Sequence, residues 1–229
     1  MAINQTAATR VSPIPPRQRP YEQALRLVFE RLQRERPSEV KLRALGAVRQ
    51  EGLIRMPALA NFLLIDLDGQ DVLVADGDSG ARPMPVGHAW ALVALHYLCA
   101  EELSVVSRAV SFSEFTDCLG YVSVFNKRVI GRFLATSGRT REQFEAASLC
   151  IGGKRMAAPG VAFAFKVLPR VPITVVWHAG DEELGAGANV IYQADAAHLL
   201  PAEDRIVAAE LVIDALNGKQ LAENGGTHA

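Results

Sequence analysis

The sequence predicts an α+β fold, arranged as a single compact domain around a mixed or antiparallel sheet. Two short β-prone runs, residues 60–66 and 71–75, flank Asp68-Gly69, a dipeptide that tolerates the positive φ angles of a tight turn. The two runs therefore predict a β-hairpin. Helices and strands do not alternate regularly along the rest of the chain, which favours α+β over a doubly wound parallel sheet.

Two stretches predict the principal helices. Residues 86–103 are apolar almost all round, as expected of a buried central helix. The last helix is expected to begin at Pro201, which suits a first helical position, and to end at Gly218. We expect an amphipathic, largely covered C-terminal helix, because its polar residues share one narrow face: Glu203, Glu210, Asp214 and Asn217.

Two more helices are expected between these. One covers residues 126–137, and the next begins at Thr140, because Thr140 and Gln143 have the spacing of a capping box. In that helix Phe144 and Leu149 are expected to face inward.

Further strands are expected over residues 162–168, 173–178 and 189–192. Pro169 and Pro172 are expected to separate the first two, because a proline cannot donate to the ladder of a central strand.

The ends of the chain are expected to lie outside the domain. Residues 1–20 contain four prolines and few apolar side chains, which predicts a disordered arm. The first helix then runs from Tyr21 until Pro37 stops it. The domain is predicted to cover residues 21–218, and residues 219–229 to be a flexible tail.

Composition excludes several classes of partner. The chain has 229 residues, 49% of them hydrophobic, and a formal net charge of −1, which argues against nucleic acid or an acidic membrane as a partner. No apolar run approaches the roughly 20 residues of a spanning helix, and the N-terminus lacks the apolar centre of a signal peptide. We expect a soluble, cytoplasmic protein whose cysteines, Cys99, Cys118 and Cys150, are buried reduced thiols.

The candidate site residues lie after the strand that is expected over residues 173–178. His178, Asp181 and Glu182 lie where that strand ends in a glycine turn, and His198 and Glu203 lie around the start of the last helix. Imidazole and carboxylate groups suit either a divalent metal or acid–base chemistry. The alternative is a solvated loop beside a helix start that favours acids. The sequence assigns no metal and no cofactor.

A second candidate element is the glycine turn that precedes Lys154 and Arg155, whose amides and cations suit an anion; the alternative is an ordinary surface turn. We expect this turn to lie near a cleft between residues 169–185 and Pro201. His178 or Asp181 would then be about 4–8 Å from His198 or Glu203. His96, in the apolar helix, is either a satisfied core histidine or a ligand to a buried cofactor.

Five segments occur in an order and spacing that resemble the prokaryotic family called domain of unknown function 3786. They are LHYL at 95–98, VSFSE at 110–114, PRVPI at 169–173, WHAGDEE at 177–183 and LLPAED at 199–204. The resemblance implies redox or cofactor-linked metabolism, since many relatives come from anaerobes and some carry an iron–sulfur segment that this chain lacks. It supplies no catalytic residues. Relatives have an Asp where this chain has Val161, and Leu-Phe-Asp near residues 191–193.

Three functions follow as hypotheses. The first is a module that binds a small ligand or cofactor, or serves a redox partner protein, in redox or anaerobic metabolism. The second is a metal-dependent enzyme that uses the histidine and carboxylate cluster, and the third is a structural or interaction domain. Hydrolase, metalloprotease and dinucleotide motifs are absent, so the sequence leaves open whether the protein is an enzyme.

Overall fold

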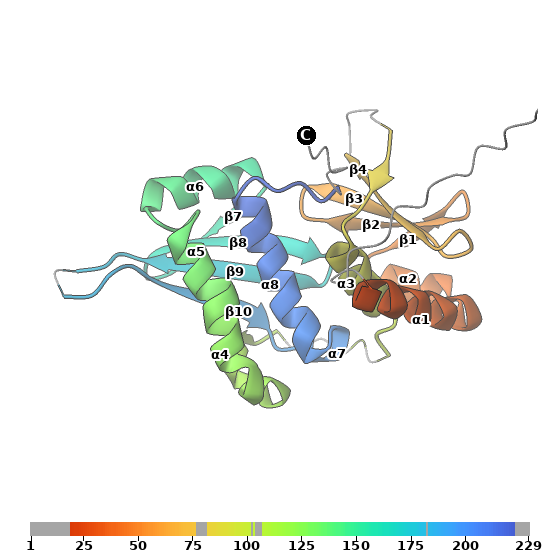
Figure 1. The fold of residues 1–229 in the computed structure, drawn as a ribbon, viewed down its shortest axis with the longest axis horizontal. Helices are drawn as coiled ribbons and strands as arrows, with labels where there is room; N and C mark the ends of the chain where they lie inside the picture. The colour runs from red at the N-terminus through yellow and green to blue at the C-terminus, as the bar shows by residue number, and fades with distance from the viewer. Residues whose placement is uncertain (1–18, 77–81, 102, 104–106, 182, 223–229) are drawn as a thin grey trace, which may run out of the picture.

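Two antiparallel five-stranded sheets form the framework of the protein, as the computed structural model shows for residues 19–76, 82–101, 103, 107–181 and 183–222. Helices pack between and beside the sheets (Figure 1). The α+β class predicted from the sequence is confirmed. Buried residues from both sheets belong to one hydrophobic core.

The first sheet is a meander in which each strand pairs with the next along the chain. Its strands are β1 (Val48–Gln50), β2 (Leu53–Ala58), β3 (Asn61–Asp66), β4 (Asp71–Asp76) and β5 (Met84–Pro85). The predicted hairpin is β3–β4, in which Asp66 pairs with Asp71. The Asp66 carboxylate accepts hydrogen bonds from the Asp68 and Gly69 amides, which fixes the turn. Neither β1 nor β2 was predicted from the sequence.

The second sheet has the order β6-β10-β9-β8-β7. Its strands are β6 (Ala109–Ser111), β7 (Lys154–Met156), β8 (Val161–Leu168), β9 (Val171–His178) and β10 (Gly187–Gln193). Pro172 lies inside the central strand β9, so the expectation that it stands outside a strand is wrong. The register slips between Lys166 and Leu168, opposite this proline, and such an irregularity accommodates the missing N–H.

The described residues contain the five predicted helices in their expected order, with shifted ends, and further short helices that were not predicted. They are α1 (Arg19–Glu35), α2 (Glu39–Ala44), α3 (His88–Leu98), α4 (Val122–Phe125), α5 (Arg132–Ala135), α6 (Arg141–Cys150), α7 (Ala196–Leu199) and α8 (Ala202–Leu216). Helix α3 is the predicted buried helix. No helix in the described ranges is both long and apolar enough to cross a membrane.

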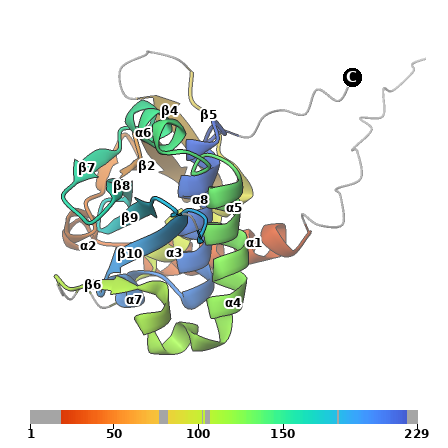
Figure 2. The ribbon, with the colours of Figure 1, turned by 90° about the vertical axis from the view of Figure 1, so that its left-hand side faces the viewer.

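The helix expected over residues 126–137 is part of a longer helical segment, residues 112–135, which we call the rod. Short 3-10 turns, η1 (Phe112–Glu114) and η2 (Thr116–Tyr121), lead into α4, and a π-helical stretch, η3 (Asn126–Gly131), joins α4 to α5. The rod runs alongside α8 (Figures 1 and 2). Arg128 donates to Glu210 at 2.7 and 2.5 Å, and Arg132 pairs with Asp214 at 3.1 Å. The predicted polar face of α8 therefore meets the rod.

Two expectations about the periphery are corrected. Leu149 does not face inward but is exposed, whereas Phe144 of the same helix is buried as predicted. Residues 219–222 are not a flexible tail, because the Leu221 side chain is buried and Ala222 forms a bridge with Val86. The predicted arm lies outside the described residues except for its last two, which begin α1.

Candidate functional site

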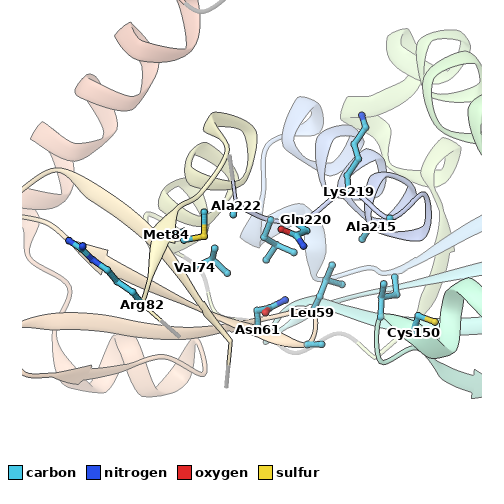
Figure 3. A pocket seen from close by; sticks show the side chains of 14 residues that line it. Leu59, Asn61, Val74, Arg82, Met84, Cys150, Ala215, Lys219, Gln220 and Ala222 are labelled. Carbon is cyan, nitrogen blue, oxygen red and sulfur yellow. The ribbon is translucent and has the colours of Figure 1, made fainter. Parts of the chain in front are cut away.

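A cavity of about 540 Å³ opens where the first sheet meets the C-terminal ends of α6 and α8. Figure 3 shows its walls. Most of its surface is apolar, and the side chains that contribute this surface include Leu59, Val74, Met84, Ile151 and Leu221. A hollow of this size with mainly apolar walls is typical of small-molecule sites.

Local backbone geometry brings these walls together. Val74 and Met84 are cross-strand neighbours of β4 and β5, so their side chains lie on the same face of the sheet. Gly218, with a φ of +79°, reverses the chain after α8. Residues 219–222, which we call the C-terminal strap, then return to the sheet edge, where the Gly87 amide donates to the Leu221 carbonyl at 3.1 Å.

Few polar groups point into the cavity. The carboxamides of Asn61 and Gln220 approach it from facing walls and point toward one another (Figure 3). The charged ends of Arg82 and Lys219 point away from its centre, and Lys219 is held by Asp214 at 2.8 Å. Cys150 also lines the cavity and is exposed, so the prediction that all three cysteines are buried is wrong for this one.

The predicted site residues of the glycine turn lie elsewhere, at the tip of the β9–β10 hairpin. The Asp181 carboxylate accepts hydrogen bonds from the Leu184 and Glu183 amides at 2.8 and 2.9 Å, which lowers its pKa. His178 Nε2 is 3.4 Å from the Asn189 amide nitrogen. These contacts shape the turn. Glu182 lies outside the described residues.

The expected cleft between this hairpin and the start of the last helix is wrong. His178 pairs with Gly187 at the beginning of β10, whereas His198 and Glu203 follow the end of that strand. Six residues of extended strand span about 20 Å, so the two groups stand at opposite ends of β10. Figure 1 shows the hairpin reaching away from α7 and α8.

Lys154 and Arg155 do not join the hairpin group either. Arg155 pairs in register with Phe163 and Val175, while His178 shares its face with Val176, so Arg155 and His178 lie on opposite faces of the sheet. Arg155 donates to Glu145 of α6 at 2.9 Å. Lys154 lies four strand positions from His178, level with Thr174.

The remaining predicted residues lie around the α7–α8 corner. His198 is in α7, and Glu203, in the first turn of α8, accepts a 3.4 Å hydrogen bond from the Tyr121 hydroxyl. Among the described residues, no group of three or more histidine, cysteine, aspartate or glutamate side chains is placed to hold a metal ion.

Sequence reasoning missed a polar cluster beneath this corner. His96 Nδ1 is 2.6 Å from the buried carboxylate of Asp204, which favours the satisfied histidine over the cofactor ligand, the two alternatives for this residue. Arg205, the next residue of α8, is also buried, and its guanidinium donates hydrogen bonds to Asp117 and to Cys118 Sγ. The signal available was His96 itself, a lone polar residue in an apolar helix, but nothing in the sequence identified its partner.

Comparison with known proteins gives one match. The model of the family described as "Domain of unknown function (DUF3786)" matches residues 37–215, about three quarters of the chain. No curated protein and no solved structure matches the chain. The matched region contains all the strands of both sheets and most of the residues that line the cavity. The C-terminal strap lies outside it.

Proposed function

We propose that this chain, which belongs to the family Domain of unknown function (DUF3786), is a module that binds a small ligand or cofactor. The cavity between the first sheet, α6, α8 and the C-terminal strap carries the proposal. Its volume of about 540 Å³ falls within the range of ligand sites, roughly 300–1,000 Å³.

The composition of the walls supports binding over catalysis. An apolar surface with a few convergent polar groups orients a ligand, whereas turnover needs a nucleophile or an acid–base group in contact with it. Of the fourteen lining residues, none is an aspartate, a glutamate or a histidine, so Cys150, a thiol in the wall, has no acid–base side chain beside it in the lining to activate it. A role as an accessory to a redox partner protein, in redox or anaerobic metabolism, is part of the same proposal and is supported by the family resemblance alone.

The test is a substitution that fills part of the cavity with a larger side chain. Val74→Trp places an indole where the β4 side chain now borders the cavity, so it should weaken binding of the uncharged fluorescent probe 1-anilinonaphthalene roughly tenfold, about 1.4 kcal/mol. The matched control is Leu73→Trp. Leu73 is the preceding residue of the same strand, is similarly half-buried, and faces the other side of the sheet with Leu64.

Probe titration should be paired with mass spectrometry of small molecules released from the purified wild-type chain. A compound retained by the wild type and by Leu73→Trp, but lost from Val74→Trp, supports the proposal. Equal weakening of probe binding by both variants, or no binding of the probe by the wild type, contradicts it.

A further inference from the structure

The polar side chains that point into the cavity are of one chemical kind. Its two inward-pointing polar groups are both carboxamides, Asn61 at the start of β3 and Gln220 on the C-terminal strap (Figure 3). No hydrogen bond joins either amide group to another residue in the described ranges. Each carboxamide offers one acceptor oxygen and two donor hydrogens, so together they can satisfy a group that both donates and accepts.

The charges nearby are poorly placed to hold an ionic ligand. Lys219 is bonded to Asp214, which also pairs with Arg132, so its charge is already compensated. The guanidinium of Arg82 points away from the cavity centre (Figure 3). An ionised group held against the apolar walls loses part of its hydration and, with both cations directed elsewhere, gains no contact with an opposite charge, which is costly.

We infer that the cavity selects an uncharged, mainly apolar molecule that carries an amide-like group, which donates to and accepts from Asn61 and Gln220. This inference rests on the proposed function and names its ligand class. Because Gln220 belongs to the strap and Asn61 to the sheet, the ligand's polar group bridges the two. Bound ligand then fixes the C-terminal strap in the position seen here.

Three probes of nearly equal size and shape separate charge from hydrogen bonding. 2-Naphthamide has the neutral amide, 2-naphthoate the negative charge, and 2-methylnaphthalene neither. For the full-length wild type we expect 2-naphthamide to bind roughly tenfold more tightly than the other two, the size of effect expected of a pair of well-formed hydrogen bonds. Affinities can be measured by displacement of the uncharged fluorescent probe 1-anilinonaphthalene.

Two variants locate the preference. Asn61→Leu and Gln220→Met remove the amide groups while roughly preserving side-chain size, so each should abolish the preference for 2-naphthamide and leave 2-methylnaphthalene binding unchanged. Neither amide makes a hydrogen bond within the described fold, so folding should not depend on them, and thermal unfolding will verify this.

The outcomes distinguish the two levels of inference. Tightest binding of 2-naphthoate overturns the ligand class and leaves the cavity as a binding site, with Arg82 or Lys219 as the anion's partner. A preference for 2-naphthamide that survives both variants also overturns the ligand class. Binding of none of the three probes overturns the proposed function itself.

Discussion

The Arg205 side chain is fully buried, which is rare for an arginine unless it is paired. Its Nη2 atom donates to Asp117 and Cys118, and the guanidinium lies 4.3 Å from the centre of the Phe115 ring. Its Nε and Nη1 atoms have no hydrogen-bond partner among the described residues. Asp117, itself half-exposed, is therefore the principal compensation for a buried charge.

Removing the Asp117 carboxylate should therefore lower the free energy of unfolding by more than is usual for a half-exposed side chain. We expect Asp117→Ala to lower the free energy of unfolding by about 2 kcal/mol, because it leaves the Arg205 charge buried without its anion. Urea unfolding measures this. The control, Asp68→Ala, breaks an exposed pair with Arg36 and should cost about 0.5 kcal/mol. Equal losses in the two variants would show that Asp117 does not compensate Arg205.

At the scale of elements, the sequence predicted those whose own pattern is strong. The Asp68-Gly69 turn specified a hairpin, and the apolar stretch of residues 86–103 specified a buried helix, which the structure has at His88–Leu98. It missed β1 and β2, because β1 is only three residues long and β2 contains Arg55 and Pro57, which break an apolar run. Pairing with β3 stabilises β2 regardless of this pattern.

The candidate site was predicted less well than the fold, for a physical reason. His178 and Asp181 lie close together in the sequence, which suggested a site. The Asp181 carboxylate, however, accepts hydrogen bonds from backbone amides of its own loop, so it serves an Asx-type turn. The cavity is formed by residues from five separated segments, none of which carries a motif. Asn61 and Gln220 face each other only because the chain reverses after α8, and no spacing rule connects positions so far apart.

Besides the buried Phe144, a carboxylate connects helix α6 to the edge strand β7 of the second sheet. Glu145 accepts hydrogen bonds from Arg155 of β7 at 2.9 Å and from Arg141 at 3.0 Å. These bonds lower the pKa of Glu145. A carboxyl whose pKa is lower in the folded state stabilises the fold above its unfolded pKa, near 4.3, and loses that contribution as the pH falls through the folded value.

The pH dependence of unfolding should reveal this attachment. We expect Glu145→Gln to lower the urea midpoint at pH 7, and the difference from wild type to shrink steadily below about pH 4, where the wild-type carboxylate becomes protonated. Glu142→Gln removes the same charge from the same helix and should not reproduce this dependence. A difference between Glu145→Gln and wild type that is independent of pH would contradict the assignment.

For the whole molecule, the cavity lies at a junction that several distant contacts define. The Leu59 amide at the end of β2 donates to the Lys166 carbonyl of β8 at 2.8 Å, which joins the two sheets. Gly46, with a φ of +73°, approaches Pro169 so closely that a Cβ would lie 2.5 Å from the proline ring, so glycine is required there. The Leu59 contact thus joins the two sheets at the cavity, where the C-terminal strap forms another of the walls.

Leu221 is the apolar anchor of that strap. Its side chain is only 7% exposed, so Leu221→Ala should lower the free energy of unfolding by about 2–3 kcal/mol through lost burial and an enlarged cavity. Leu184→Ala, the same substitution at a hairpin residue that is 71% exposed, should change it by less than about 0.5 kcal/mol. Because Leu221 also lines the cavity, its variant should weaken binding of 1-anilinonaphthalene, while Leu184→Ala should not. Full stability of Leu221→Ala in urea would mean that the strap is not anchored by this side chain, and that the wall it forms depends on the backbone contacts of Gly87 and Val86 alone.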